Sequence, residues 1–337
     1  MMQGYGAMKI RQPGVAWHKT AGLGLGLLAL MGISVLAVLA GCTGDAGISF
    51  LDPQGPVAAA QKAHLLKVTA ISLIVVLPVL LLVPLIAWRY RRGNESAKYK
   101  PDWAFFRPLE IAMWGIPAII VVVLGLQLWR NTVALNPYTP LPSSTPALRV
   151  EVVGLDWKWL FIYPDLGVAT LDELAFPQDR PLSLRLTSDT VMQSFMIPAL
   201  GGQIYVMPGM QTQLNLRADK PGRFGGLNTQ FNGSGFQDQR FSAVAMAPTD
   251  FDAWVEQVRR AGVPLNAASY AVLGRPSTPA IAARALGTPA MPPEVLYFKS
   301  VTPDLFAAVM HKYMSGKPVM STQQPGAPGY QSPGLKP

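Results

Sequence analysis

The residue types that most often hold metals or act as nucleophiles are scarce in this chain of 337 residues, which has one cysteine, Cys42, and three histidines. Thiolate copper, iron–sulfur and zinc-finger sites need several cysteines, or cysteine with clustered histidines. A lone cysteine also has no partner for an internal disulfide. If residues 1–41 are removed, only His64 and His311 remain. The composition therefore argues against a transition-metal site built by this chain alone.

Cys42 stands directly after Leu39-Ala40-Gly41, at the end of an apolar run without charge from residue 21 to 40. Three basic residues precede the run: Lys9, Arg11 and Lys19. A charged segment, an apolar segment and small residues before a cleavage point are typical of an export signal. We expect residues 1–41 to be a cleaved lipoprotein signal and Cys42 to carry the lipid. The alternative is a plain membrane-spanning segment that holds a buried cysteine.

Two further runs, 68–87 and 111–129, contain no charge and are long enough to cross a bilayer. They predict transmembrane helices over 65–88 and 109–130, with a buried soluble hairpin as the alternative. The loop between them, 89–108, has a net charge of +4, which favours a cytoplasmic location. The segment 42–64 and everything after the second span would then lie in the periplasm, anchored in a bacterial inner membrane.

The net positive charge of the chain comes mainly from residues 1–41 and from the 89–108 loop. The formal net charge is +9, and removing residues 1–41 leaves +6, of which the 89–108 loop supplies +4. The excess positive charge therefore indicates membrane topology and does not point to nucleic acid.

Proline, serine and threonine dominate residues 131–147, which predicts an extended linker. Apolar residues then alternate with period two: Val150 and Val152; Leu182, Leu184 and Leu186; Leu214 and Leu216. Short alternating runs separated by Pro and Gly predict a β-sandwich or small barrel over 148–248. Met192 and Met246 are interpreted as core residues without a ligand role.

Residues 249–316 change to helical periodicity and predict a C-terminal helical arm. One helix is expected to be capped by Thr249 and to end at Gly262, and a second to run from Thr302 to Gly316. Lys312, beside His311, is expected to be solvated on the polar side of the second helix. Residues 317–337, rich in Pro, Gly, Ser and Gln, are predicted to be disordered.

A set of motifs along the chain carries a family resemblance. The motifs are VGLDWKW at 153–159, SF at 194–195, IP at 197–198, GQIY at 202–205, PGMQT at 208–212, GSGF at 233–236, YF at 297–298 and PDLF at 303–306. In this order, behind two membrane spans, they resemble subunit II of the haem-copper terminal oxidases, and more narrowly that of the cytochrome bo-type ubiquinol oxidases. The resemblance implies a membrane-anchored all-β fold, with a two-helix hairpin, a cupredoxin-like Greek-key β-sandwich and C-terminal helices.

The copper-containing branch of this family binds two copper ions through two histidines, two cysteines, a methionine and a glutamate carbonyl. By the resemblance, the side-chain ligand positions are occupied here by Gln193, Asn228, Asn232, Phe236 and Gln239. Amides and a phenyl ring cannot replace bridging thiolates and imidazoles. The resemblance therefore implies a periplasmic domain without copper.

The resemblance also implies a function. In the family, quinol is oxidised at a site in subunit I, electrons pass through a low-spin haem to a haem-copper centre, oxygen is reduced to water and protons are pumped. This chain would bind no cofactor of its own and would supply docking, stability and a role in proton entry. The expected partners are subunit I, which holds the haems and copper, the smaller subunits III and IV, membrane lipid, and quinol through subunit I. No nucleic acid is expected.

Glu110 is the ionisable side chain singled out for function, because it lies at the cytoplasmic start of the second span after Arg107 and Pro108. Carboxylates at membrane depth are costly and often mark proton paths, and the resemblance places a glutamate here at the entrance of a proton channel of subunit I. The alternative is that Glu110 only favours the helix dipole. Trp157 and Trp159 are interpreted as packing residues, since a donor-facing role lapses without copper.

Two other functions stay open from the sequence. One is a copper-binding subunit II of a cytochrome c oxidase, against which the missing cysteines argue. The other is a free periplasmic binding or assembly lipoprotein that reuses the sandwich. The two extra spans count against that function, because a lipid anchor alone would tether a soluble domain.

Overall fold

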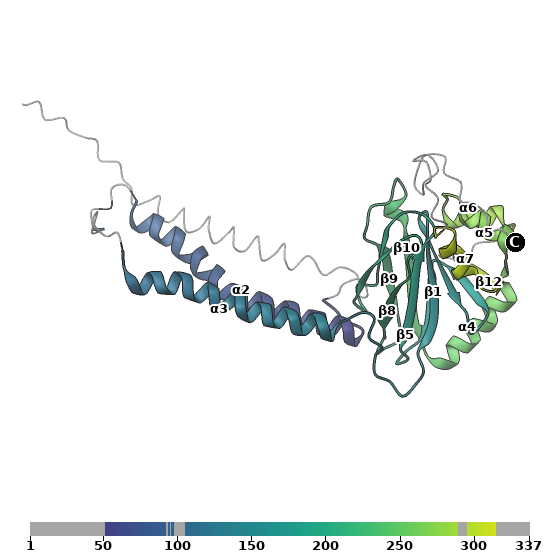
Figure 1. Ribbon diagram of the computed structural model, residues 1–337, viewed down its shortest axis with the longest axis horizontal. Coiled ribbons are helices and arrows are strands. Elements are labelled where there is room, and N and C mark those ends of the chain that lie inside the picture. The colour runs from purple at the N-terminus through teal and green to yellow at the C-terminus, as the bar shows by residue number, and fades with distance from the viewer. Residues whose placement is uncertain (1–50, 92–93, 95, 98–104, 289–294, 315–337) are drawn as a thin grey trace, which may run out of the picture. The chain divides into compact units, whose positions relative to one another are not determined.

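The computed structural model describes residues 51–91, 94, 96–97, 105–288 and 295–314 (Figure 1). Cys42, the signal segment and the tail from 317 to 337 lie outside the described residues. The described chain begins with two long helices, α2 (Pro56–Arg89) and α3 (Arg107–Ala134), which pack against each other.

Both helices are long and apolar enough to cross a membrane, and neither buries its apolar window within the described protein. Each has a proline at its first or second position, where the missing N–H costs nothing. Both continue past the predicted spans, and the interior prolines, Pro78, Pro84 and Pro117, do not end them. The predicted pair of long apolar helices is confirmed.

A two-sheet sandwich follows. Its strands are β1 (Leu148–Leu155), β2 (Lys158–Tyr163), β3 (Val168–Leu171), β4 (Glu173–Pro177), β5 (Leu182–Ser188), β6 (Gln193–Met196), β7 (Gln203–Val206), β8 (Thr212–Leu216), β9 (Gly222–Asn228) and β10 (Arg240–Met246). One sheet has the order β11-β12-β3-β2-β1-β5-β8 and the other β4-β10-β9-β6-β7. Pairs β1–β5, β4–β10 and β11–β12 are parallel, and the other pairs are antiparallel.

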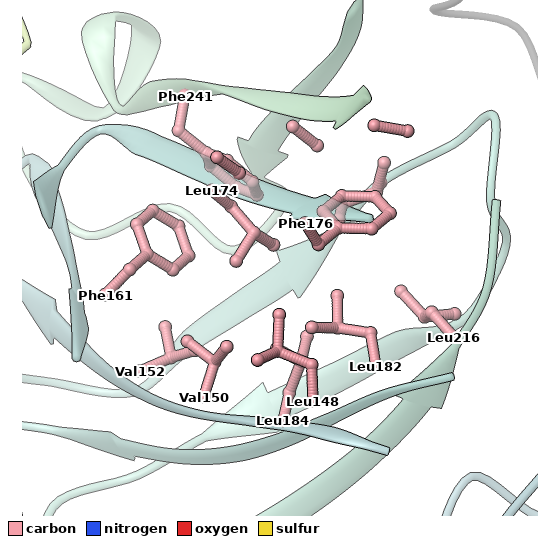
Figure 2. Packing of buried hydrophobic residues seen from close by; sticks show 14 of the residues in the cluster. Leu148, Val150, Val152, Phe161, Leu174, Phe176, Leu182, Leu184, Leu216 and Phe241 are labelled. Atoms are coloured by element: carbon pink, nitrogen blue, oxygen red, sulfur yellow. The ribbon is translucent and has the colours of Figure 1, made fainter. Parts of the chain in front are cut away.

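The main core lies between the sheets. Figure 2 shows aliphatic side chains of β1 and β5, such as Val150 and Leu184, in one layer, with Phe176 and Phe241 of the other sheet in the facing layer. The period-two runs predicted as strands are confirmed, because their alternate apolar residues are buried in this core. Phe195 of β6 and Phe241 of β10 stack with ring centroids 4.9 Å apart, and Trp159 packs edge-on to Phe195 at 5.2 Å.

The C-terminal arm, defined here as residues 248–314, covers the outer face of the seven-stranded sheet. Its elements are α4 (Pro248–Ala261), β11 (Val263–Leu265), α5 (Ala267–Leu273), α6 (Pro279–Ala285), β12 (Leu296–Val301) and α7 (Leu305–His311). A second core lies under it, where Leu160 and Ile162 of β2 meet Tyr270 and Phe306 of the arm. Figure 1 shows the arm helices gathered on the β1 and β12 side of the sandwich.

The predicted C-terminal helices are confirmed, but two strands that were not predicted lie among them. β11 and β12 extend the seven-stranded sheet beyond β3, a pairing between distant segments that local periodicity does not reveal. Thr249 does not cap the first helix: Ala247 holds the N-cap position and Pro248 begins the helix, which ends before Gly262 as expected. The last helix is also shorter than predicted, since it spans only Leu305–His311.

Candidate functional site

Three loops meet at one end of the sandwich. They are the β1–β2 turn at 156–157, the β5–β6 loop at 189–192 and the β9–β10 loop at 229–239. The strands fix where each loop begins, because β1 pairs with both β2 and β5 and β9 pairs with both β6 and β10.

Four side chains from these loops and their flanking strands form the amide cluster, which we define as Gln193, Asn228, Asn232 and Gln239. The Gln239 carboxamide is its centre. Its Oε1 accepts hydrogen bonds from Asn228 Nδ2 at 2.9 Å and Asn232 Nδ2 at 2.7 Å, and its Nε2 donates to Gln193 Oε1 at 2.7 Å. The cluster therefore joins β6, β9 and the loop that leads into β10.

Backbone and hydroxyl groups hold the rest of the cluster. Gln193 Nε2 donates to Leu155 O at 3.1 Å and to Thr190 Oγ1 at 2.9 Å, while Asn228 Oδ1 accepts from the backbone N–H of Ser194 at 2.9 Å. All four amides are more than nine-tenths buried. Buried amides without such partners would be costly, so their mutual bonding is the condition for their burial.

Trp157, in the β1–β2 turn, packs against the β9–β10 loop. Its ring lies against Gly233 and Gly235, and a Cβ added at Gly235 would come within 2.2 Å of the indole. Trp157 has a φ of 62°, a left-handed conformation that is unfavourable for a bulky side chain. The interpretation of Trp157 and Trp159 as packing residues is confirmed, because Trp159 is fully buried in the main core.

Of the five positions that the family resemblance assigned to copper ligands, four form the amide cluster and one does not. Phe236 is partly exposed and pairs with the ring of Phe231 at 5.7 Å. The Gln239 carboxamide bonds to the other three amides, and amides do not supply the soft, anionic ligands that a binuclear copper site needs. Among the residues that the structure describes, no group of three or more His, Cys, Asp or Glu side chains could hold a metal ion. The residues present do not fit that copper centre.

Next to the cluster, Asp189 forms a buried ion pair with the arm. Its Oδ2 lies 2.7 Å from Lys312 Nζ and accepts from Tyr270 Oη at 2.6 Å, while its Oδ1 accepts from Tyr313 Oη at 2.9 Å. The Asp189 side chain is fully buried and that of Lys312 is 8% exposed. The expectation that Lys312 is solvated was therefore wrong, because β5 and the following loop cover the face of α7 that the helical pattern left polar.

Lys158 is a second buried cation that the sequence did not single out. Its Nζ donates to the carbonyls of Asp156 at 2.9 Å, Arg275 at 3.1 Å and Ser277 at 2.8 Å, which ties β2 to the segment between α5 and α6. Burial lowers the pKa of Lys158 to about 8, against the opposing charges of Asp172 and Asp156.

Glu173 is the third contact of this kind. Its Oε1 accepts from Trp254 Nε1 at 3.0 Å and from Tyr297 Oη at 3.1 Å, so one buried carboxylate holds α4 and β12 against β4. Burial and the neighbouring Glu173 raise the pKa of Tyr297 to about 12. Together, Asp189, Lys158 and Glu173 fasten the arm to the sandwich.

The predicted proton-entry residue, Glu110, does not belong to the three loops at this end of the sandwich. Glu110 is in the first turn of α3 and is partly buried. The 19 residues that follow Glu110, 111–129, span about 28 Å of helix, close to the thickness of the hydrocarbon layer. Glu110 would therefore sit at the boundary of that layer. Of the two methionines interpreted as core residues, Met246 packs against the main core, but Met192 is 39% exposed.

Fold and site define a class: a membrane-anchored β-sandwich of the cupredoxin type with a buried amide cluster at one end. The chain is 40% identical over 288 residues to the cytochrome bo(3) ubiquinol oxidase subunit 2 of Pseudomonas putida, covering 86% of this chain and 85% of the relative. It is 41% identical over 289 residues to the ubiquinol oxidase subunit 2 of Acetobacter aceti, covering 85% of this chain and 88% of the relative. The chain therefore belongs to the family of ubiquinol oxidase subunit 2, and the predicted resemblance is confirmed.

Residues 289–317 match the family model described as COX Aromatic Rich Motif. The periplasmic domain of subunit II of cytochrome oxidase from Bradyrhizobium japonicum aligns with 35% of this chain and 98% of its own length, at 23% identity and a TM-score of 0.33.

Asp189, Lys158 and Glu173 were missed by sequence reasoning. The alternation Trp157-Lys158-Trp159 places Lys158 on the face opposite Trp159, but nothing near it in the sequence shows that the arm covers this face. Asp189 does carry one signal in hindsight: it is the last charged residue before a run of 27 uncharged ones, 190–216.

Proposed function

We propose that this chain is the non-redox subunit II of a proton-translocating quinol oxidase, which oxidises ubiquinol and reduces oxygen to water in aerobic respiration. The amide cluster is the observation that carries the proposal. Since these residues do not fit a copper centre, the periplasmic domain offers no station for an electron from a soluble cytochrome. A quinol dissolved in the membrane would reach the haems of a partner subunit directly.

The charge of the domain supports the same proposal. Residues 148–316 contain fourteen basic and fourteen acidic side chains. Proteins that capture a charged soluble donor usually do so with a surface of one sign, and a balanced domain lacks a net field of that kind.

In this proposal the chain contributes structure and no electron transfer. The haems and copper would lie in subunit I, with the smaller subunits III and IV completing the complex. The amide cluster and the three arm contacts would hold the periplasmic loops in one conformation. The helices α2 and α3 would dock within the bacterial inner membrane, with Cys42 as an additional lipid anchor.

Oxygen uptake tests the central claim. The purified complex should consume oxygen with ubiquinol as donor and not with reduced cytochrome c. The isolated full-length chain in detergent, incubated with copper and dialysed, should retain none. Stoichiometric copper in that chain would contradict the proposal, and so would a tagged chain that brings down no haem-bearing partner.

Glu110 is proposed to serve proton entry, because a partly buried carboxylate at the boundary of the hydrocarbon layer is costly unless it is used or paired. Glu110→Gln keeps the size of the side chain and removes its titration. The pH profile of oxygen uptake should then change, whereas Asp52→Asn, before α2, should leave it unaltered. An unchanged profile in Glu110→Gln would leave only the helix-dipole role.

Cys42 is proposed as the lipidated first residue of the mature chain. Metabolic labelling with palmitate should mark the wild type and not Cys42→Ser. A labelled Cys42→Ser chain would refute the assignment.

A further inference from the structure

Two cations lie on α2 and α3 where positive charge is least expected. Lys67 directly precedes the uncharged run 68–87, and Arg130 directly follows the uncharged run 111–129. In the proposed topology both positions are at the periplasmic ends of the spans. Lysine and arginine beside a span favour the cytoplasmic side, so the topology of the chain does not account for this pair.

The two cations share one depth and one side of the helix pair. α2 and α3 pack against each other through half-buried positions spaced three or four residues apart: Gln61, His64, Val68, Ile71 and Val75 of α2, and Ile120, Leu124, Gln127 and Asn131 of α3. Lys67 and Arg130 each come one residue before such a position, Val68 or Asn131, and one residue turns a helix by about 100°. Two antiparallel helices are related by a two-fold axis, so equal turns point both side chains to the same side of the pair.

Neither cation has a carboxylate partner in the part of the chain that the structure describes. Both are exposed, and none of the ion pairs among the described residues includes Lys67 or Arg130. α2 and α3 contain a single acidic residue, Glu110, at the opposite end of α3. Trp129, beside Arg130, is 73% exposed, and tryptophan is typical of the headgroup level of a membrane. Two like charges at this level are favourable when an anion lies between them.

Toward the membrane, the same side of the helix pair is apolar. Ile74 lies seven residues after Lys67 and Val123 seven residues before Arg130, which is about two helical turns in each case. Ile74 is 60% exposed and Val123 39% exposed. This surface fits an acyl chain whose phosphate lies at the two cations.

Toward the water, the ends of the two helices border a polar cavity of about 300 Å³. Gln61, six residues before Lys67, and Asn136, six residues after Arg130, both line this cavity. Six residues of helix correspond to about 9 Å, and lysine and arginine side chains extend toward water from such positions. A headgroup with hydroxyls, held by its phosphate at the cations, would reach these amides.

We propose that Lys67 and Arg130 bind the phosphate of an anionic phospholipid of the outer leaflet, whose glycerol headgroup occupies the cavity. The arginine fork donates paired hydrogen bonds to phosphate oxygens, and the lysine supplies a second positive charge. This inference goes beyond the proposed function, because it needs only the proposed membrane orientation of α2 and α3 and no haem-bearing partner.

Native mass spectrometry of the full-length chain in detergent tests the proposal, with phosphatidylglycerol as the anionic lipid and phosphatidylcholine as the zwitterionic one. The wild type should bind phosphatidylglycerol at least tenfold more tightly. A basic residue near an anionic headgroup contributes roughly fivefold, so Lys67→Gln should weaken this binding about fivefold and the double variant with Arg130→Gln more than tenfold. Lys62→Gln is the matched control, since Lys62 is turned about 140° from Lys67 on α2, and should stay within twofold of wild type. Equal affinities for the two lipids, or equal losses in Lys62→Gln and Lys67→Gln, would overturn the proposal.

A second set of measurements keeps both cations in place. A photo-crosslinking amino acid at position 74 should link the chain to phosphatidylglycerol in proteoliposomes far more than one at position 62, and equal links from both would refute the site. Inorganic phosphate at the concentration of the lipid should not displace it; displacement would mean that the cations bind free phosphate. The lipid preference should persist in the chain purified with its oxidase partners, and its loss there would show that a subunit covers the site. A chain that brings down no haem but keeps the preference removes only the proposed function, which separates the two claims.

Discussion

Replacing Gln239 with leucine should destabilise the sandwich strongly. The substitution keeps the size of the side chain but removes both polar atoms at the centre of the amide cluster. Asn228 Nδ2, Asn232 Nδ2 and Gln193 Oε1 would each lose the partner that the structure gives them. A buried polar group left unsatisfied costs about 1–3 kcal/mol. Three such groups, partly relieved by local rearrangement, give a loss of about 3–5 kcal/mol.

Hydrogen exchange of the full-length chain in detergent measures this loss, because exchange is followed at individual backbone amides and the sandwich can be observed separately from α2 and α3. Backbone amides of β9 and β10 report on the sandwich, and 3 kcal/mol corresponds to exchange about 100-fold faster. Gln213→Leu is the matched control, because this amide makes one bond, to Ser183 Oγ at 3.5 Å, on the partly exposed face of β8. Its effect should stay below about 1 kcal/mol. Equal effects in the two variants would show that the cluster does not stabilise the domain.

Three further predictions concern the contacts around the cluster. The pKa of Lys158 is about 8 in the folded state and 10.5 in the unfolded state. Between pH 8 and 10.5 the folded state therefore binds fewer protons than the unfolded state, and the free energy of unfolding should rise with pH. From pH 8 to 10 the free energy of unfolding, measured with urea, should rise by about 2 kcal/mol. The rise should remain in the control variant Lys299→Met and disappear in Lys158→Met. Above pH 10 the raised pKa of Tyr297 lowers the free energy of unfolding instead. Asp189→Asn leaves the buried Lys312 ammonium without its counter-charge, at a cost of about 3–5 kcal/mol, so backbone amides of α5 and α7 should exchange more than about 100-fold faster while those of β10 keep their protection; wild-type protection of α5 and α7 in this variant would refute the role of Asp189. Gly235→Ala pushes a methyl group into the Trp157 ring and should cost about 1–3 kcal/mol in the same exchange assay, whereas Gly167→Ala, with open space around it, should show only the cost of its φ of 68°.

Features that depend on neighbours in sequence were predictable. Continuous uncharged runs in the sequence predicted α2 and α3, and leucines at every second position predicted β5 and β8. Both patterns can be seen directly in the sequence. The family resemblance supplied what periodicity could not, namely that Gln193, Asn228 and Gln239 come together although they are far apart in the chain.

Features that depend on distant segments were not predictable. Lys158 reaches a carbonyl 119 residues away, and Asp189 reaches Lys312 across 123 residues. A lysine on the polar side of a short helix has the same local pattern whether water or a carboxylate faces it. The burial of Lys312 is decided by how the arm folds back on the sheet, and the same holds for β11 and β12, which look like loops until the sheet they extend is known.

The amide cluster and the arm are linked through one short segment, 188–190. Thr190 Oγ1 accepts from Gln193 of the cluster, while the neighbouring Asp189 accepts hydrogen bonds from Lys312, Tyr270 and Tyr313 of the arm. A metal ion can cross-link such loops at once, with a binding energy that contributes directly to folding. Here the loops are cross-linked by several hydrogen bonds of about 1 kcal/mol each, together with a buried ion pair. Because a buried ion pair adds little net stability compared with apolar packing, its value lies in specifying one arrangement.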